Sequence, residues 1–224
     1  MLNRTSVKAM HFHVITLFKD AIESYVNESI VGRAKGEKKI KVTYYNPRHF
    51  AGKKVGYVDG KPYGGGPGMV LQALPIVKSV EKALSSAKSR KKVKVIILSP
   101  NGTQFTNDYA HKLSKNVEHI ILIAGRYEGI DSRVNKILRA EEISAGPYIL
   151  TGGELPAAMI IDAVSRQLKG VLGNFESREE SRIAGSEVYT RPEVLEYKGK
   201  KYKVPRVLLS GNHAKIKEWK AKHT

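Results

Sequence analysis

The sequence predicts an α/β domain with a mainly parallel sheet, followed by a linker and a short basic helical segment. Short apolar runs alternate with longer stretches of helical periodicity, and this alternation stops after Gly173. We therefore expect an α/β domain at residues 1–172, a loop at 173–187 and a basic segment at 188–224.

Four apolar runs predict the strands of the sheet. Each is six residues long, a usual length for a strand, and each is rich in apolar and β-branched residues. Such runs are typical of parallel strands that are covered on both faces; they lie at 13–18, 40–45, 93–98 and 119–124.

Helices are predicted between and after these runs. Apolar residues recur at helical spacing at 74–84 and at 155–164, where Pro156 stands near the start. Residues 174–186 are polar and charged, as in a linker. A basic helix is expected at 214–222.

The charge of the chain predicts a polyanionic partner. The net charge is +18 over 224 residues, with eight basic residues at 33–54 and nine at 197–224, where Tyr197, Tyr202 and Trp219 are interleaved. Basic residues mixed with aromatic rings suit RNA, which is held through phosphates and stacked bases. A solvated lysine-rich surface is the alternative.

Several classes of protein and site are excluded or not expected. The chain has no cysteine, so disulfides and zinc fingers are absent, and its seven histidines show no spacing typical of a metal site. No signal-peptide core or membrane-spanning apolar run is found, and we expect a cytoplasmic protein without a membrane partner. The sequence also lacks the G-x-G-x-x-G, P-loop, G-x-S-x-G and H-E-x-x-H motifs.

Glycine-bearing segments are the candidates for a ligand site. Three of them, at 97–102, 124–131 and 144–156, follow apolar runs, and ligands of open α/β sheets bind at the carboxyl ends of strands. The fourth, at 62–69, predicts a sharp turn near an interface or substrate.

Eight strings resemble, in order and at similar spacing, the bacterial tRNA (guanine-N1)-methyltransferases, which modify the guanine just 3′ of the anticodon. The resemblance covers the chain from about His11, and the strings are PYGGGPGM, LSPNG, AGRYEGIDSRV, GPYILTGGELPA, DAVSR, GVLGNFES, YTRPEVLE and PRVLLSGNHAKIKEW. It implies the SPOUT fold with a trefoil knot, an antiparallel homodimer with active sites at the subunit interface, and a shortened tRNA-binding segment at 188–224.

The resemblance also implies S-adenosylmethionine as the methyl donor. Glycine-permitted turns suit recognition of such a cofactor by main-chain groups, although the glycines can equally serve the turns of the knot. The positions that inherit the cofactor role are Leu98, Ser99, Pro100, Gly102, Gly125, Ala145, Gly146, Pro147, Tyr148, Ile149, Leu150, Gly152 and Gly153.

Two residues inherit catalytic roles from the resemblance. N1 of guanine carries a proton at neutral pH, so a base must remove it while a cation stabilises the charge on O6. Arg166 matches the arginine of the family, and alignment on Ser181 puts Glu180 at the position of the base, with Glu179 beside it. An ungapped count from Gly173 puts Ser181 there instead, which leaves no base.

Glu128 resembles a position linked to magnesium in the family; the alternative is that it only hydrogen-bonds its own loop. Pro147 and Ile97 depart from the family pattern, which usually has Asp and often Tyr at these positions. The expected reaction is methyl transfer to N1 of the guanine 3′ of the anticodon. A weakly catalytic RNA-binding relative and a knotted methyltransferase of ribosomal RNA are the alternatives.

Overall fold

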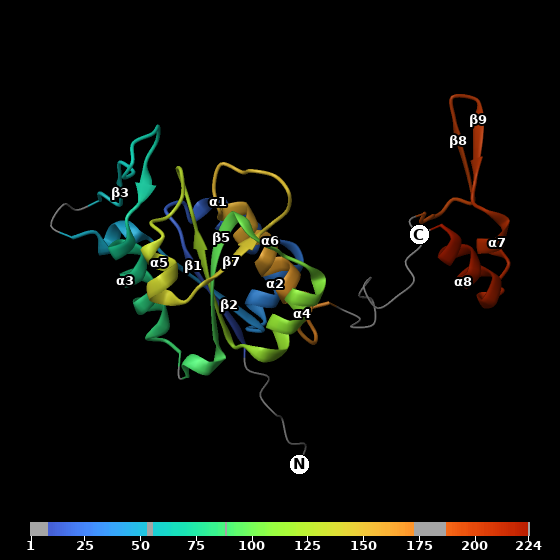
Figure 1. Cartoon of the computed structure of the whole chain (residues 1–224). Helices are drawn as coiled ribbons and strands as arrows, with labels where there is room; N and C mark the ends of the chain where they lie inside the picture. Colours follow the sequence, from blue (N-terminus) through green and yellow to red (C-terminus); the bar gives the residue numbers. More distant parts are fainter. Residues whose placement is uncertain (1–8, 53–55, 88, 173–186, 224) are drawn as a thin grey trace, which may run out of the picture. The chain divides into compact units, whose positions relative to one another are not determined.

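The computed structural model describes residues 9–52, 56–87, 89–172 and 187–223. The chain divides into two compact units, with the boundary between Val171 and Leu172. Each unit is described by itself (Figure 1).

A five-stranded parallel sheet forms the centre of the first unit, which confirms the predicted fold class. The order across the sheet is β2-β1-β6-β5-β7, and each neighbouring pair is parallel (Figure 1). The strands are β1 (Met10–Ile15), β2 (Ile40–Tyr45), β5 (Val93–Gln104), β6 (His119–Ala124) and β7 (Glu141–Ser144).

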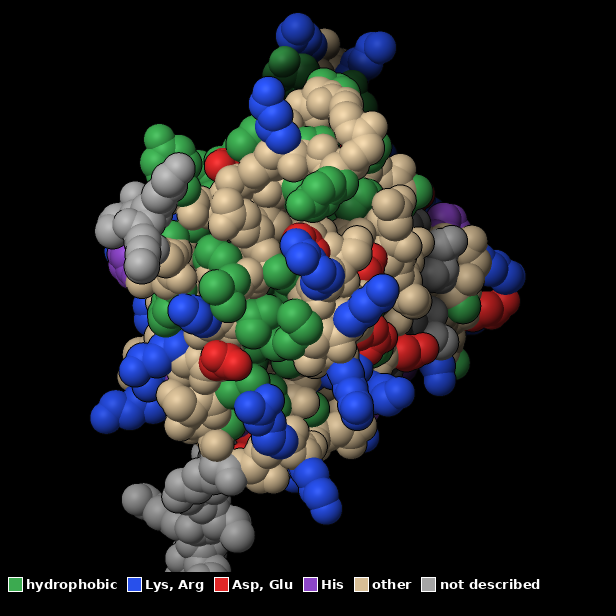
Figure 2. Space-filling view, turned by 60° about the vertical axis from the view of Figure 1, so that its left-hand side comes forward, with side chains coloured by type: hydrophobic (Ala, Val, Ile, Leu, Met, Phe, Trp, Pro, Cys, Tyr) green, Lys and Arg blue, Asp and Glu red, His purple; other side chains and the backbone are tan. Residues whose placement is uncertain are grey.

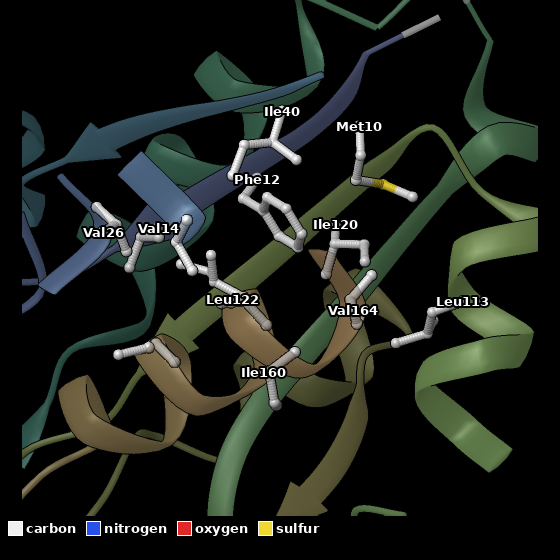
Figure 3. Packing of buried hydrophobic residues seen from close by; sticks show 14 of the residues in the cluster. Met10, Phe12, Val14, Val26, Ile40, Leu113, Ile120, Leu122, Ile160 and Val164 are labelled. Carbon is white, nitrogen blue, oxygen red and sulfur yellow. The ribbon is translucent and has the colours of Figure 1, made fainter. Parts of the chain in front are cut away.

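Helices cover both faces of this sheet because its strands send alternate apolar side chains to each face. Phe12 and Ile120 pack with α1 (Asp20–Val26), α2 (Ser29–Gly36), α4 (Asn107–Asn116) and α6 (Glu154–Ser165), as Figure 3 shows in part. Ile121 and Ile123 pack on the other face with α3 (Ala73–Leu84) and α5 (Arg133–Leu138).

The predicted elements differ from the structure mainly at their ends. The strands expected at 40–45 and 119–124 are β2 and β6, and the helices expected at 74–84 and 155–164 are α3 and α6. The run at 93–98 continues to Gln104, and the run expected at 13–18 begins earlier, at Met10. The second difference arises because His11 looks polar in the sequence, whereas it is half-buried within the strand and pairs with both neighbouring strands.

The glycine-rich segment at 62–69 connects a short antiparallel pair, β3 (Asp59–Gly60) and β4 (Val70–Leu71). Gly64, Gly65, Gly66 and Gly68 all have positive φ, so residues with a Cβ would be strained in this turn. Two 3-10 helices complete the first unit, η1 (Pro47–Phe50) and η2 (Arg90–Lys92).

Within residues 187–223, the second unit contains a hairpin and two helices. The hairpin pairs β8 (Val194–Tyr197) with β9 (Lys200–Lys203), and α7 (Arg206–Leu209) and α8 (His213–Lys222) follow. The Asn212 side chain caps α8 by accepting a hydrogen bond from the Lys215 N–H at 3.1 Å, and the Trp219 ring stacks on His223 with centroids 4.2 Å apart. No helix within the described ranges is both long and apolar enough to cross a membrane.

Candidate active site

A cavity of about 460 Å³ opens at the carboxyl ends of β5, β6 and β7. Its walls come from the three glycine-bearing segments that follow these strands. The volume lies within the range of small-molecule sites, roughly 300–1,000 Å³. A cavity of ligand size therefore lies at the strand ends where the sequence predicted a ligand site.

An irregularity in β5 builds the first wall. Ile143 of β7 pairs with both Leu98 and Thr103, so the residues between them form a bulge outside the ladder. Leu98, Ser99 and Pro100 line the cavity in this way. Gly102 does not line it; a Cβ on Gly102 would lie 2.4 Å from the Glu142 carbonyl carbon, so glycine lets the chain return beside β7.

The loop after β6 builds the second wall. Gly125 lines the cavity, and its carbonyl oxygen accepts a hydrogen bond from the Gly153 N–H at 2.9 Å. A Cβ on Gly125 would lie 3.5 Å from Ile130 Cδ1 and 3.7 Å from the Leu98 carbonyl oxygen, which is ordinary contact. The protein alone therefore does not require glycine at this position.

The segment after β7 builds the third wall. Ala145, Tyr148, Ile149 and Leu150 line the cavity, as do Gly152 and Gly153, whereas Gly146 and Pro147 do not. The Ser144 hydroxyl donates to the Gly146 carbonyl at 2.9 Å and accepts from its N–H at 3.2 Å, which holds the turn. Ten of the thirteen positions assigned to the cofactor thus line one cavity.

A buried carboxylate joins the loops behind the cavity. The Glu154 side chain is only 3% exposed, and its Oε1 accepts a hydrogen bond from the Thr16 hydroxyl at 2.8 Å. Its Oε2 lies 2.9 Å from Arg126 Nε without a hydrogen bond between these two atoms, so the contact is an ion pair. The Arg126 guanidinium also lies over the Phe18 ring, 4.5 Å from its centroid. These contacts fix the first turn of α6 to the ends of β1 and β6.

Arg166 lies far from the cavity of its own chain. It is the C-cap of α6, its N–H donates to the Asp162 carbonyl at 3.0 Å, and it does not line the cavity. The cavity borders the N-terminal end of the same helix, and the 12 residues from Glu154 to Arg166 span about 18 Å at the helical rise. One chain therefore does not bring Arg166 to this cavity.

Other predicted acidic groups have different surroundings. Asp162 accepts a hydrogen bond from the Tyr25 hydroxyl, and this bond raises the pKa of Tyr25. Glu179 and Glu180 lie outside the described residues, so the position of the base stays a prediction.

Glu128 lines the cavity and contacts the glycine-rich turn. Its N–H donates to the Met69 carbonyl at 3.0 Å, and a Cβ on Gly68 would come within 2.5 Å of Glu128 Oε1. The turn therefore lies beside the cavity wall. Around Glu128, the described residues gather no set of three acidic or imidazole ligands.

Sequence reasoning missed some polar residues of the cavity. Asn135 and Glu142 both line it, and the Asn135 side-chain amide donates to Glu142 Oε1 at 2.7 Å. Glu142 belongs to β7, which is too short and too polar for its hydropathy to predict a strand. Because this strand was not predicted, nothing in the sequence indicates that these two side chains line the cavity.

Comparisons with known proteins agree with this arrangement. The family model described as tRNA (Guanine-1)-methyltransferase TrmD matches residues 10–224. The chain is 44% identical to a tRNA (guanine-N(1)-)-methyltransferase of Pseudoalteromonas atlantica, covering 95% of this chain and 79% of that protein. It is 46% identical to the protein of the same name from Thermomicrobium roseum, over 94% and 77% of the two chains.

A solved structure is also similar. The crystal structure of tRNA (m1G37) methyltransferase from Aquifex aeolicus matches with a TM-score of 0.77 and 42% identity. The match covers 96% of this chain and 89% of that one.

Proposed function

Because the chain belongs to the tRNA (guanine-N1)-methyltransferase family, we propose that it transfers a methyl group from S-adenosylmethionine to N1 of the guanine 3′ of the anticodon in tRNA. The observation that supports this most directly is the cavity formed by the glycine-bearing loops after β5, β6 and β7. In open α/β sheets such a position is where ligands bind.

The cavity suits the proposed cofactor. Its walls include three glycine-bearing loops, whose main-chain N–H and C=O groups suit an adenine and a ribose. Gly125 has no steric reason within the protein to lack a Cβ, so close approach of a ligand explains it best. The cofactor supplies an electrophilic methyl group to this site.

The chain must then activate the guanine. We assign the removal of the N1 proton to Glu180, with Glu179 as the neighbouring alternative, and stabilisation of the charge at O6 to Arg166. The Glu154–Arg126 pair holds the loops that form the cofactor walls. Asp162 is the next candidate for the base, although the Tyr25 hydroxyl already donates to it.

The distance between Arg166 and the cavity supports a homodimer. The cavity borders one end of α6 and Arg166 caps the other end, so a complete site needs Arg166 from a second copy. Leu155, Met159 and Arg166 follow one another along one face of α6, where Leu155 is 64% and Met159 36% exposed. An antiparallel pair that covers this apolar face would bring each arginine toward the cavity of its partner.

Subunit mixing tests this arrangement. Arg166→Ala and a cavity variant such as Gly125→Leu should each form an inactive homodimer. A refolded equal mixture should recover about a quarter of wild-type activity, because half of the dimers are mixed and each has one intact site. If each chain supplied its own arginine, the mixture would stay inactive, and the proposal of a shared site would be wrong.

Basic and aromatic residues support tRNA as the substrate. Lys and Arg side chains project from many points of the face in Figure 2. In the second unit, the β8–β9 hairpin carries exposed Tyr197 and Tyr202 among lysines, and Lys198 Nζ lies 5.4 Å from the centroid of the Tyr197 ring. Such surfaces hold phosphates and stack on bases.

Magnesium stays a prediction that rests on Glu128. Mg²⁺ takes one or two carboxylates together with water and substrate oxygens. Since the described residues around Glu128 do not form a set of three metal ligands, we assign the metal no step in the reaction. Comparing methyl transfer in EDTA with transfer after Mg²⁺ is restored tests this role.

Transfer of labelled methyl groups to an unmodified tRNA transcript tests the function. We expect incorporation at one nucleotide, with loss of the signal when the guanine 3′ of the anticodon is replaced by adenine. Tight tRNA binding without incorporation would favour the weakly catalytic RNA-binding relative. Incorporation into ribosomal RNA alone would favour a knotted methyltransferase of ribosomal RNA.

A further inference from the structure

Three histidines meet at the amino-terminal edge of the central sheet. His11 and His13 lie two residues apart on β1, and His119 begins β6, where it pairs with His11. Their side chains share one face because alternate residues of a strand point the same way. One ring nitrogen from each lies within 4.8 Å of the others.

We propose that His11, His13 and His119 bind a divalent transition-metal ion of the zinc class. Spacing along the sequence does not indicate this cluster, which forms only in the folded chain. The site arises from the pairing of β1 with β6, which brings together residues more than a hundred positions apart. It is separate from the cofactor cavity, since His119 and Ala124 stand at opposite ends of β6, about 16 Å apart at the rise of a strand.

One nitrogen–nitrogen distance in the cluster is close to that of a zinc site. His13 Nε2 and His119 Nδ1 are 3.0 Å apart, and tetrahedral zinc with bonds of about 2.0–2.1 Å holds its nitrogen ligands about 3.3 Å apart. One ring nitrogen of each of the three histidines lies within 4.8 Å of the other two, so the rings must draw together around the ion. Water can complete the fourth position beside the partly exposed His11.

Neighbouring hydroxyls orient two of the rings as outer partners do in metal sites. His13 Nδ1 is 3.1 Å from the Tyr45 hydroxyl oxygen, and His11 Nε2 is 2.8 Å from Thr43 Oγ1. Each contact leaves the other nitrogen of that ring as the ligand. Coordination then requires the proton of His13 on Nδ1, where Tyr45 accepts it, and the proton of His119 on Nε2.

The chemistry of the cluster selects the kind of ion. The ligand set consists of imidazoles alone, which suit zinc, copper and nickel, whereas magnesium and calcium prefer oxygen ligands. Burial lowers the pKa of His11 to about 4 and that of His13 to about 3, so both rings are neutral at pH 7, as ligands must be. The Lys41 ammonium, which also lowers both pKa values, opposes a cation in the site.

Titration of the chelator-treated full-length protein with Co²⁺ and then Zn²⁺ tests the proposal. We expect the visible absorption bands of four-coordinate Co²⁺ to saturate at one ion per chain and to disappear when Zn²⁺ displaces it. His11→Gln and His119→Gln should each weaken binding at least tenfold. The exposed His49 and His213 provide matched controls, since His49→Gln and His213→Gln should leave binding unchanged.

Two further variants keep the test decisive if a histidine variant misfolds. Lys41→Gln, at an exposed position, should tighten binding about two- to fivefold because it removes a nearby positive charge. Thr43→Val should weaken binding because it removes the outer partner of His11. Binding that is absent in the wild type, or unaffected by the Lys41 and His11 variants, would overturn the proposal; circular dichroism and methyl transfer check that each variant is folded.

Discussion

Gly125→Ala separates the needs of the cofactor from those of the fold. The added Cβ would lie 3.5 Å from Ile130 Cδ1 and 3.7 Å from the Leu98 carbonyl oxygen, distances of ordinary contact. The free energy of unfolding should therefore change by less than about 1 kcal/mol, since a tolerated Gly→Ala exchange even stabilises by about 0.4–1 kcal/mol. The same methyl group would occupy cavity space, and we expect cofactor affinity to fall at least tenfold, which is about 1.4 kcal/mol.

Gly102→Ala is the matched control, with the opposite result. Its Cβ would lie 2.4 Å from the Glu142 carbonyl carbon and 2.5 Å from the Ile143 nitrogen, and the backbone of β7 cannot move away as a side chain can. Overpacking of this kind costs about 1–3 kcal/mol. Urea unfolding and calorimetric titration with S-adenosylmethionine measure both quantities. Wild-type affinity in Gly125→Ala, or equal destabilisation of the two variants, would refute the reasoning.

Three other variants or conditions test the remaining parts of the molecule. Glu154→Gln removes the charge beside Arg126 and should destabilise the fold by about 1–3 kcal/mol in urea unfolding; an unchanged midpoint would contradict the role of the pair. Arg166→Ala should lower kcat by about 10²–10⁴ and leave cofactor affinity unchanged, since its charge acts at O6 in the transition state; a rise in KM alone would contradict this. In a chelator, stability should fall as the pH decreases from about 6.5 toward 4, because the unfolded chain then binds protons that the folded His11 and His13 do not. The loss should be smaller for the partly exposed His11 than for the fully buried His13, and His11→Gln should reduce the slope of unfolding free energy against pH.

Apolar patterns predicted the sheet because buried parallel strands appear in a sequence as short apolar runs. The runs that became β2 and β6 have the observed ends; β6 is buried along its whole length, whereas only Ile40 of β2 is buried. β1 was placed too late because hydropathy treats His11 as polar, although His11 lies within the strand and pairs with Lys41 and His119. The short edge strand β7 contains no such apolar run and was not predicted.

The lining of the cavity was predicted to the level of loops and less well to the level of residues. Loops after parallel strands meet at one edge of a sheet, which is why three separate glycine segments line one cavity. Which residue of a turn points inward depends on the bulge between Leu98 and Thr103 and on the turn held by Ser144. Local sequence patterns do not predict this bulge or this turn. A knot cannot be predicted from local patterns either, because it depends on how the chain is threaded.

The length of α6 bears on how the catalytic groups are shared between subunits. Successive turns follow Arg166: the Leu168 N–H donates to the Ser165 carbonyl and the Val171 N–H to the Leu168 carbonyl, so the described chain up to Leu172 stays near the Arg166 end of the helix. We therefore expect Arg166 and Glu180 to come from the same subunit and to serve the cofactor of its partner. Mixing Arg166→Ala with Glu180→Gln should then restore no activity, whereas mixing either variant with Gly125→Leu should restore about a quarter. Recovery in the first mixture would show that the two groups come from different chains.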